Sequence, residues 1–314
     1  MTTSIRGDDR SEAPPIGGRI TELFRTVGAR GYLHAREVDG DRELGLDADD
    51  PVVLASVFKI PVVLTYARQV VAGELDPAGR TRVTARDRIG GVGTAGCADD
   101  VEMSWRDLAL FALTMSDNAA TDVLLRRVGV DAVRTVLAEL GLRRTRIIGG
   151  CEDLFATMAD ELAAQFSAID RTDLQALFAA ATPDQFRALA VCDPDRTTAS
   201  TPREITTLLA SIWQDTAGPA PACEQVRTIM HQQIWPHRIS SGFGDEVLIG
   251  AKTGTLPYIR NEAGVLTFPD GRRYAVAVFT VADSPAQRAP AIDTAIGEAA
   301  RLAVSALRNE GVAA

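Results

Sequence analysis

Ser56 and Lys59 are spaced so that they could work together as a nucleophile and its base. They open a long stretch, SVFKIPVVLTYARQVV, in which apolar residues recur at helical spacing. A three-residue step on a helix places both side chains on one face, where they can touch. Burial would disfavour the ammonium form of Lys59, whose amine could then take the Ser56 proton near a helix N-terminus that favours negative charge. The alternative is a buried helix whose lysine reaches solvent, and this pattern alone does not decide between them.

A second polar cluster, Ser116-Asp117-Asn118, follows the expected helix 105–115. A serine in a loop can pass a proton to a leaving nitrogen, and Asn118 could hold a substrate amide while it bonds the lysine. The alternative is that the three residues end one helix and cap the next one, as such residues often do.

A third cluster, Lys252-Thr253-Gly254-Thr255, ends the expected strand 246–253. Gly254 would let a substrate backbone lie against the strand, the two threonines offer hydroxyl groups, and Lys252 would attract an anionic group. The alternative is an edge-strand lysine that discourages aggregation. Lys59 and Lys252 are the only lysines among the 33 basic residues, and both fall in such clusters. An arginine could not replace a lysine that must lose its proton.

Taken in order, SVFK, SDN and KTGT resemble the three motifs of class A β-lactamases and penicillin-binding proteins. The similarity extends over about residues 17–308. It implies an acyl-enzyme on Ser56, with Lys59 as a candidate base and Ser116 as a proton shuttle. It further implies substrate contacts, to an amide from Asn118 and to a carboxylate from the third cluster, which consists of Lys252, Thr253, Gly254 and Thr255. The backbone amides of Ser56 and Thr255 would form the oxyanion hole.

Two further residues follow from this resemblance. Class A enzymes carry Glu-x-x-Leu-Asn in a loop after SDN, whereas this chain has CEDLF at 151–155, so Glu152 is the candidate for the deacylating base. The asparagine is missing, and Gly149-Gly150 suggests a different local backbone. Arg238, ahead of Lys252, lies where some members place an arginine that supports the substrate carboxylate. An exposed arginine without that role is the alternative.

Composition points to a globular protein with a small-molecule partner. The net charge of -9 and the pI near 5.0 disfavour nucleic acid and anionic membranes as partners. We expect no cofactor, metal or disulfide, because the four cysteines show no zinc-site spacing. Residues 1–15 are polar and proline-bearing, so they predict a disordered tail without a secretion signal, hence a cytoplasmic protein. A monomer is expected.

The order of elements predicts an α/β (α+β) fold of the β-lactamase type. Strands 31–38 and 42–48 form a hairpin around Asp39-Gly40, and further strands lie at 246–253, 262–268 and 274–282 before a closing helix at 291–307. The segment between them is mostly helical, with a helix start at Thr201-Pro202. We therefore expect an antiparallel sheet flanked by terminal helices, formed by 16–54 and 225–314, and an inserted all-helical lobe at 55–224. An added helical pair at 156–195 would border the cleft, as a lid or as a solvated elaboration.

These features predict a serine hydrolase that cleaves β-lactam amides through an acyl-Ser56 intermediate, with an anionic amide or ester as substrate. One alternative is an intracellular amidase, esterase or acyl-transferase that uses the same serine and lysine on another metabolite. A second alternative is a penicillin-binding sensor without turnover. A histidine-based hydrolase is disfavoured, because the chain has three histidines and no G-x-S-x-G motif.

Overall fold

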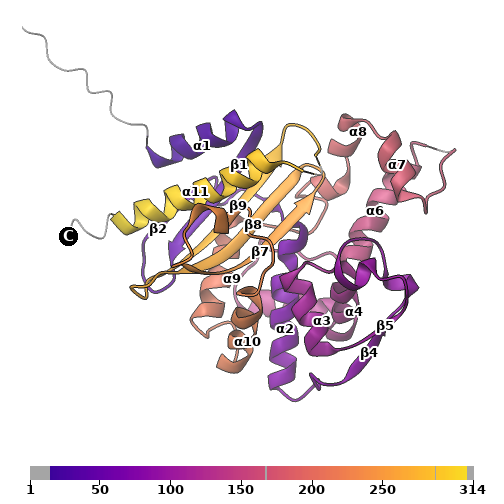
Figure 1. Cartoon of the computed structure of the whole chain (residues 1–314), viewed down its shortest axis with the longest axis horizontal. Coiled ribbons are helices and arrows are strands. Elements are labelled where there is room, and N and C mark those ends of the chain that lie inside the picture. Colours follow the sequence, from indigo (N-terminus) through magenta and orange to yellow (C-terminus); the bar gives the residue numbers. More distant parts are fainter. Residues whose placement is uncertain (1–14, 167, 287, 310–314) are drawn as a thin grey trace, which may run out of the picture.

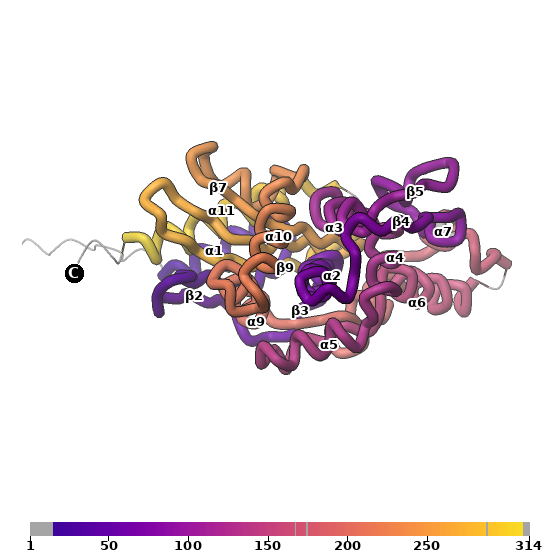
Figure 2. The backbone as a smooth tube through the Cα atoms, turned by 90° about the horizontal axis from the view of Figure 1, so that it is seen from below, coloured from indigo at the N-terminus to yellow at the C-terminus, as the bar shows by residue number. Residues whose placement is uncertain are grey.

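The computed structural model describes residues 15–166, 168–286 and 288–309. Apart from Pro15, the predicted N-terminal tail lies outside these residues. The chain forms a five-stranded sheet with a helical part beside it along the long axis (Figure 2).

The sheet is antiparallel throughout and has the order β2-β1-β9-β8-β7. Its strands are β1 (Ala29–Glu37), β2 (Glu43–Leu46), β7 (Leu248–Leu256), β8 (Ile259–Thr267) and β9 (Arg273–Ala282). The predicted hairpin around Asp39-Gly40 is confirmed, with Leu33 opposite Leu46. Strand β7, which carries the KTGT segment, is an edge strand of this sheet.

Helices cover both faces of the sheet. On one face lie α1 (Ile16–Thr26) and α11 (Pro290–Asn309), and on the other lies α9 (Pro202–Trp213) (Figure 1). Alternation along β9 separates two cores, because Val276 and Val278 pack towards the terminal helices while Ala277 and Phe279 pack towards the helical part. Helix α1 precedes the first strand, as the expected sheet with terminal helices requires.

The helical part surrounds a buried central helix, α2 (Lys59–Val71), which follows the 3-10 turn η1 (Ala55–Phe58). Its other helices are α3 (Trp105–Thr114), α4 (Asn118–Val128), α5 (Val130–Glu139), α6 (Cys151–Ala163) and α10 (Ala220–Met230). It also holds two short two-stranded sheets, one of β3 (Val52–Val53) with β6 (Ala199–Ser200) and one of β4 (Arg80–Val83) with β5 (Val101–Ser104). The lobe is therefore not purely helical. Further 3-10 turns are η2 (Ala85–Asp87), η3 (Gly93–Gly96), η4 (Ala190–Cys192) and η5 (Ile239–Gly242).

The segment that we expected to hold an added helical pair contains the end of α6 and the short helices α7 (Leu174–Ala180) and α8 (Pro183–Arg187). Helix α8 begins with a capping box, in which Thr182 and Gln185 bond each other's backbone N–H groups. The Tyr258 hydroxyl donates to the Pro183 carbonyl at 2.7 Å, which ties α8 to the turn between β7 and β8.

The predicted start of α9 is confirmed in part. The Thr201 hydroxyl accepts the backbone N–H of Glu204 at 3.1 Å, and Pro202 occupies the first helical position. The Glu204 carboxylate, however, binds the hydroxyl of Thr145 and the N–H of Arg144. Glu204 on α9 therefore binds the segment that precedes α6. No helix among the described segments combines the length and the apolar character that crossing a bilayer requires.

Candidate active site

A cavity of about 660 Å³ brings together segments from both parts of the molecule. Its wall includes Ser56 on η1, Ser116 and Asn118 at the junction of α3 and α4, Cys151 at the start of α6, and Thr253 and Thr255 on β7. The three predicted clusters therefore meet in one place, although they are far apart in sequence.

Lys59 lies directly behind this wall and is fully buried. Its Nζ contacts the Ser116 carbonyl at 2.8 Å, the Ser116 Oγ at 3.3 Å and the Asn118 Oδ1 at 2.9 Å. The alternative of a lysine that reaches solvent is wrong. Ser56 is not a hydrogen-bond partner of Nζ in the described structure; it lies on η1, and Lys59 begins α2. Lys59 thus connects the first cluster to the second.

Two residues with positive φ hold the reactive groups in place. Ala55, just before Ser56, has φ 45°, and Ser116 has φ 67°. Side chains other than glycine rarely adopt this left-handed region, and such strain persists only where the surrounding structure enforces it. Packing around the two serines therefore overrides local backbone preference.

Asp117 and Asn118 serve the fold as well as the cavity. The Asp117 carboxylate caps α4 by accepting the N–H of Ala120 at 3.0 Å, and it also accepts the hydroxyl of Thr94 at 2.7 Å. The Asn118 Nδ2 donates to the Gly90 carbonyl at 3.1 Å. The cluster therefore caps a helix, and Asn118 bonds the lysine as expected. The proton transfer by Ser116 and the substrate contact of Asn118 stay predictions.

Gly254 has a packing role that we did not expect, and the substrate contact expected for it stays a prediction. A Cβ at this position would lie 2.7 Å from the Leu54 carbonyl oxygen. The absent side chain therefore lets β7 lie against the turn before Ser56, which is part of the protein itself and not a substrate. This close approach places Thr253 and Thr255 in the same cavity wall as Ser56.

Lys252 is fully buried, so it is not a solvated edge-strand lysine. Its Nζ donates to the Thr253 carbonyl at 2.8 Å, and its side chain does not line the cavity. Burial, followed by the charges of Lys59 and Arg238, holds the pKa of Lys252 well below its usual value. Any effect of Lys252 on a ligand would act from behind the wall.

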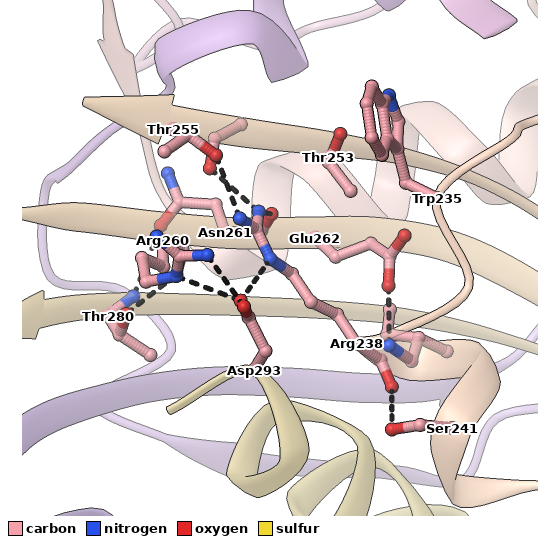
Figure 3. A network of polar contacts seen from close by, with 12 residues as sticks. Trp235, Arg238, Ser241, Thr253, Thr255, Arg260, Asn261, Glu262, Thr280 and Asp293 are labelled. Atoms are coloured by element: carbon pink, nitrogen blue, oxygen red, sulfur yellow. Dashed lines mark hydrogen bonds and ion pairs between the residues drawn. The ribbon is translucent and has the colours of Figure 1, made fainter. Parts of the chain in front are cut away.

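Arg238 reaches the cavity from the segment before β7 and is 4% exposed, which excludes the alternative of an exposed arginine. Its Nε donates to Asp293 at 2.7 Å and its Nη2 to the Thr255 hydroxyl at 2.8 Å. Arg260 on β8 binds the same Asp293 carboxylate at 2.8 and 2.6 Å, and Figure 3 shows the two guanidinium groups converging on it. Burial favours protonation of Asp293, but the two arginines outweigh it and hold its pKa below the ordinary value.

The outer edge of β7 is aligned by Gln233. Its Oε1 accepts the Thr253 N–H at 2.9 Å, and its Nε2 donates to the buried Glu262 at 2.6 Å. The Thr253 N–H therefore points away from β8. Because residues two apart in a strand present their N–H groups in the same direction, that of Thr255 also points to this edge.

At the start of α6 the cavity is lined by Cys151 and not by Glu152. The Glu152 side chain is 59% exposed and pairs with Arg126 at 3.5 Å. Contrary to our expectation, Glu152 lies outside the cavity, and we assign it no catalytic role. Asp122 holds the helix start, since its carboxylate accepts the N–H groups of Cys151 at 2.6 Å and Glu152 at 2.8 Å.

Sequence reasoning missed several residues of this site. A signal was present for Cys151, because counting back three residues from Leu154, the leucine of the family motif, reaches Cys151 and not Glu152. Glycines 90, 91 and 93 gave a weaker signal for the loop that packs on Asn118 and Asp117. Nothing in the sequence marked Asp293 or Arg260, whose roles depend on long-range packing. No group of three or more metal-ligating side chains occurs in the parts of the chain that the structure describes.

The fold and the cavity define a serine hydrolase of the β-lactamase type, and comparison with known proteins agrees with this class. The model of the β-lactamase enzyme family matches residues 16–307, so the chain belongs to that family. The β-lactamase regulatory protein BlaB of Streptomyces cacaoi is 28% identical over 306 residues, which cover 92% of this chain and 96% of that protein. A β-lactamase of Streptomyces albus G is 26% identical over 318 residues, covering 96% and 88% of the two chains.

Solved structures show the same fold. A β-lactamase of Sphaerobacter thermophilus superimposes with a TM-score of 0.72 at 24% identity, covering 95% of this chain and 97% of that one. An ancestral class A β-lactamase has a TM-score of 0.73 at 22% identity and coverage of 93% and 100%. A mutant of PBP-A, solved as an acyl-enzyme complex with penicillin G, has a TM-score of 0.71 at 19% identity and coverage of 95% and 100%.

Proposed function

We propose that Ser56 attacks β-lactam amides and forms an acyl-enzyme. The observation that carries this proposal is the meeting of Ser56, Ser116 and Asn118 in one cavity wall with a fully buried lysine behind them. A neutral binding surface would have no need to bury an amine beside a serine, whereas nucleophilic catalysis requires a base within reach.

The contacts suggest a route for the proton during acylation. Lys59, as the free amine, accepts the Ser56 proton while Ser56 Oγ bonds to the lactam carbonyl carbon. The ring C–N bond then breaks, and the proton passes through Ser116 Oγ, 3.3 Å from Lys59 Nζ, to the leaving nitrogen. The outward N–H of Thr255 and that of Ser56 are placed to stabilise the oxyanion.

The far side of the cavity favours an anionic substrate. Arg238 and Arg260 carry two positive charges against the single carboxylate of Asp293, and Lys252 lies behind Thr253. The hydroxyls of Thr253 and Thr255 face the same cavity. We propose that a substrate carboxylate binds here, as guanidinium and hydroxyl groups suit such an anion. Arg238 would support this site through Thr255, to which it donates.

A regulatory role is a second candidate. The observation that favours it is the similarity to a β-lactamase regulatory protein over nearly the whole length of both chains. A regulator of this kind would keep the acylation step and signal the bound state. The two candidates share Ser56 and differ in the fate of the acyl group.

Intact-protein mass spectrometry with benzylpenicillin tests the proposal. We expect a mass increase of one penicillin on the protein, located on the peptide that contains Ser56, and no increase in Ser56→Ala. If neither an adduct nor opened penicillin forms under conditions in which the protein is folded, the proposed function is wrong. An adduct that survives in Ser56→Ala would assign the nucleophile to another residue.

A further inference from the structure

The wall formed by the start of α6 differs chemically from the rest of the cavity. We call Cys151, Leu154 and Phe155 the α6 wall, since these three side chains line the cavity from that helix. The α6 wall contributes one thiol and otherwise apolar surface. The question is which group on it, or near it, could act on an acyl group attached to Ser56.

Hydrolysis of such an acyl group needs a proton acceptor. The water oxygen forms a bond to the ester carbonyl carbon, the bond from that carbon to Ser56 Oγ breaks, and the serine oxygen takes up a proton. The water must lose a proton at the same time, and a positioned base makes this step about 10² to 10⁴ times faster. A carboxylate without other partners would be suited to the task.

The carboxylates near the cavity are already committed to other partners. Among the described residues that line the cavity, Asp293 is the only acidic one, and two arginines bind it. Glu262 is fully buried and accepts from Gln233 and from the N–H of Ile239. Glu152 is directed to Arg126 and solvent. Asp122 does not line the cavity and accepts the N–H groups of Cys151 and Glu152. Each of these carboxylates is therefore held by cations, enclosed, or outside the cavity. His237 also lines the cavity, but from the segment before η5 and not from the α6 wall.

Cys151 stands on the cavity side of α6 but cannot replace such a base. Its side chain is almost fully buried, and the Asp122 carboxylate fixes its backbone through a hydrogen bond of 2.6 Å. Burial raises the pKa of the Cys151 thiol to about 12, and the neighbouring Lys59 offsets only part of this rise. At neutral pH the thiol keeps its own proton and has no capacity to accept one from water.

Lys59 is also poorly placed for this step in the described arrangement. Its Nζ already donates to the Ser116 carbonyl, the Ser116 hydroxyl and Asn118 Oδ1, although its charge also acts on the neighbouring Cys151 thiol. The lysine therefore serves the side of the cavity where acylation takes place. Nothing that lines the α6 wall provides an equivalent group for water.

We propose that Cys151 sets the lifetime of the acyl-enzyme: acylation of Ser56 is efficient, but hydrolysis is slow because the α6 wall presents a thiol where water would need a base. This inference rests on the proposed function, since it presupposes an acyl group on Ser56. According to this inference, the opened β-lactam stays bound to Ser56 and is released slowly.

The test measures acylation and deacylation separately in the full chain. Protein is acylated with excess benzylpenicillin, freed from the excess, and followed by intact mass spectrometry as the adduct decays. Four proteins are compared: the wild type, Cys151→Glu, Cys151→Ser and Glu152→Gln. We expect Cys151→Glu to lose the adduct about 100 times faster or more. We expect the neutral Cys151→Ser and the distant Glu152→Gln to remain within about threefold of the wild type.

The outcomes distinguish this inference from the proposed function. Absence of any adduct and of opened penicillin in the wild type refutes the proposed function itself. Rapid turnover by the wild type leaves the function intact and overturns the inference. A longer adduct lifetime in Glu152→Gln would also overturn it, because it would identify Glu152 as the base.

The pH dependence of the wild type provides a check that does not require Cys151→Glu to fold. Without a base of ordinary pKa, adduct decay depends on hydroxide and rises about tenfold per pH unit between pH 6 and pH 9. A rate that levels off within this range would reveal a titrating base in the cavity and overturn the inference.

Discussion

Two walls of one cavity show opposite arrangements of polar groups. The polar wall, which we define as Ser56, Ser116, Asn118, Thr253 and Thr255, is backed by the buried side chains of Lys59 and Arg238, whose hydrogen bonds reach it. The α6 wall faces it with a protonated thiol and apolar side chains. Under the mechanism that we propose, the cavity would favour formation of a bond to Ser56 over its hydrolysis.

The difference shows that membership of an enzyme family does not settle each step of its reaction. Attack by Ser56 and departure of the lactam nitrogen depend on the polar wall, whereas attack by water depends on what faces the acyl group from the other side. Each wall can be altered separately, because they come from different elements. The following variants separate them.

The largest effect is expected for Lys59→Arg, which removes the amine of the polar wall. An arginine remains protonated and cannot accept the Ser56 proton. We expect the rate of acylation to fall by about 10³-fold or more, as measured by the growth of the penicillin adduct. Circular dichroism and the unfolding midpoint serve as controls for the fold. A rate within tenfold of the wild type would exclude Lys59 as the base.

Asp293→Asn tests whether the cationic end of the polar wall is held together by one carboxylate. The substitution leaves Arg238 and Arg260 buried without their shared counter-charge. Removing one member of a buried ion pair costs about 3 to 5 kcal/mol, and we expect the free energy of unfolding in urea to fall by such an amount. A change below about 1 kcal/mol would show that the two arginines do not depend on Asp293.

The α6 wall depends on Asp122, and its pKa gives a pH signature. Burial raises the pKa of Asp122 to about 6 from an ordinary value of 3.8. An acid whose pKa is raised by folding stabilises the folded state fully at pH values below its ordinary pKa. This contribution is lost as the pH rises through the folded-state pKa of about 6. We expect the stability of the wild type relative to Asp122→Asn to fall by about 2 kcal/mol from pH 4 to pH 7. If the unfolding free energies of the two proteins change with pH in the same way, the raised pKa of Asp122 is wrong.

Gly254→Ala should have the smallest effect of the four. Its methyl group would meet the Leu54 carbonyl, so β7 must move away from the turn before Ser56. We expect a loss of about 1 to 3 kcal/mol in unfolding free energy, with slower acylation. Gly17→Ala on α1 is a suitable control, because a Cβ there has no atom within 4 Å. Equal behaviour of both variants would refute the role of this contact.

Much of the fold could be predicted from the sequence because its signals are local. The turn at Asp39-Gly40, the caps at Thr182 and Thr201, and the alternation in β9 each depend on neighbours along the chain. No local sequence signal predicted the ion pairs that Arg238 and Arg260 form with Asp293. These residues come from three segments, and only their packing brings them together.

The sequence by itself determined which groups could do chemistry: one serine with a lysine three residues later, and two more clusters in an order typical of a known family. Only the tertiary structure decided which of two adjacent residues enters the cavity. Successive residues of a helix point about 100° apart, so when α6 begins at Cys151 the thiol faces the cavity and Glu152 faces Arg126. This difference in direction places a thiol, and not a carboxylate, in the cavity that Ser56 lines.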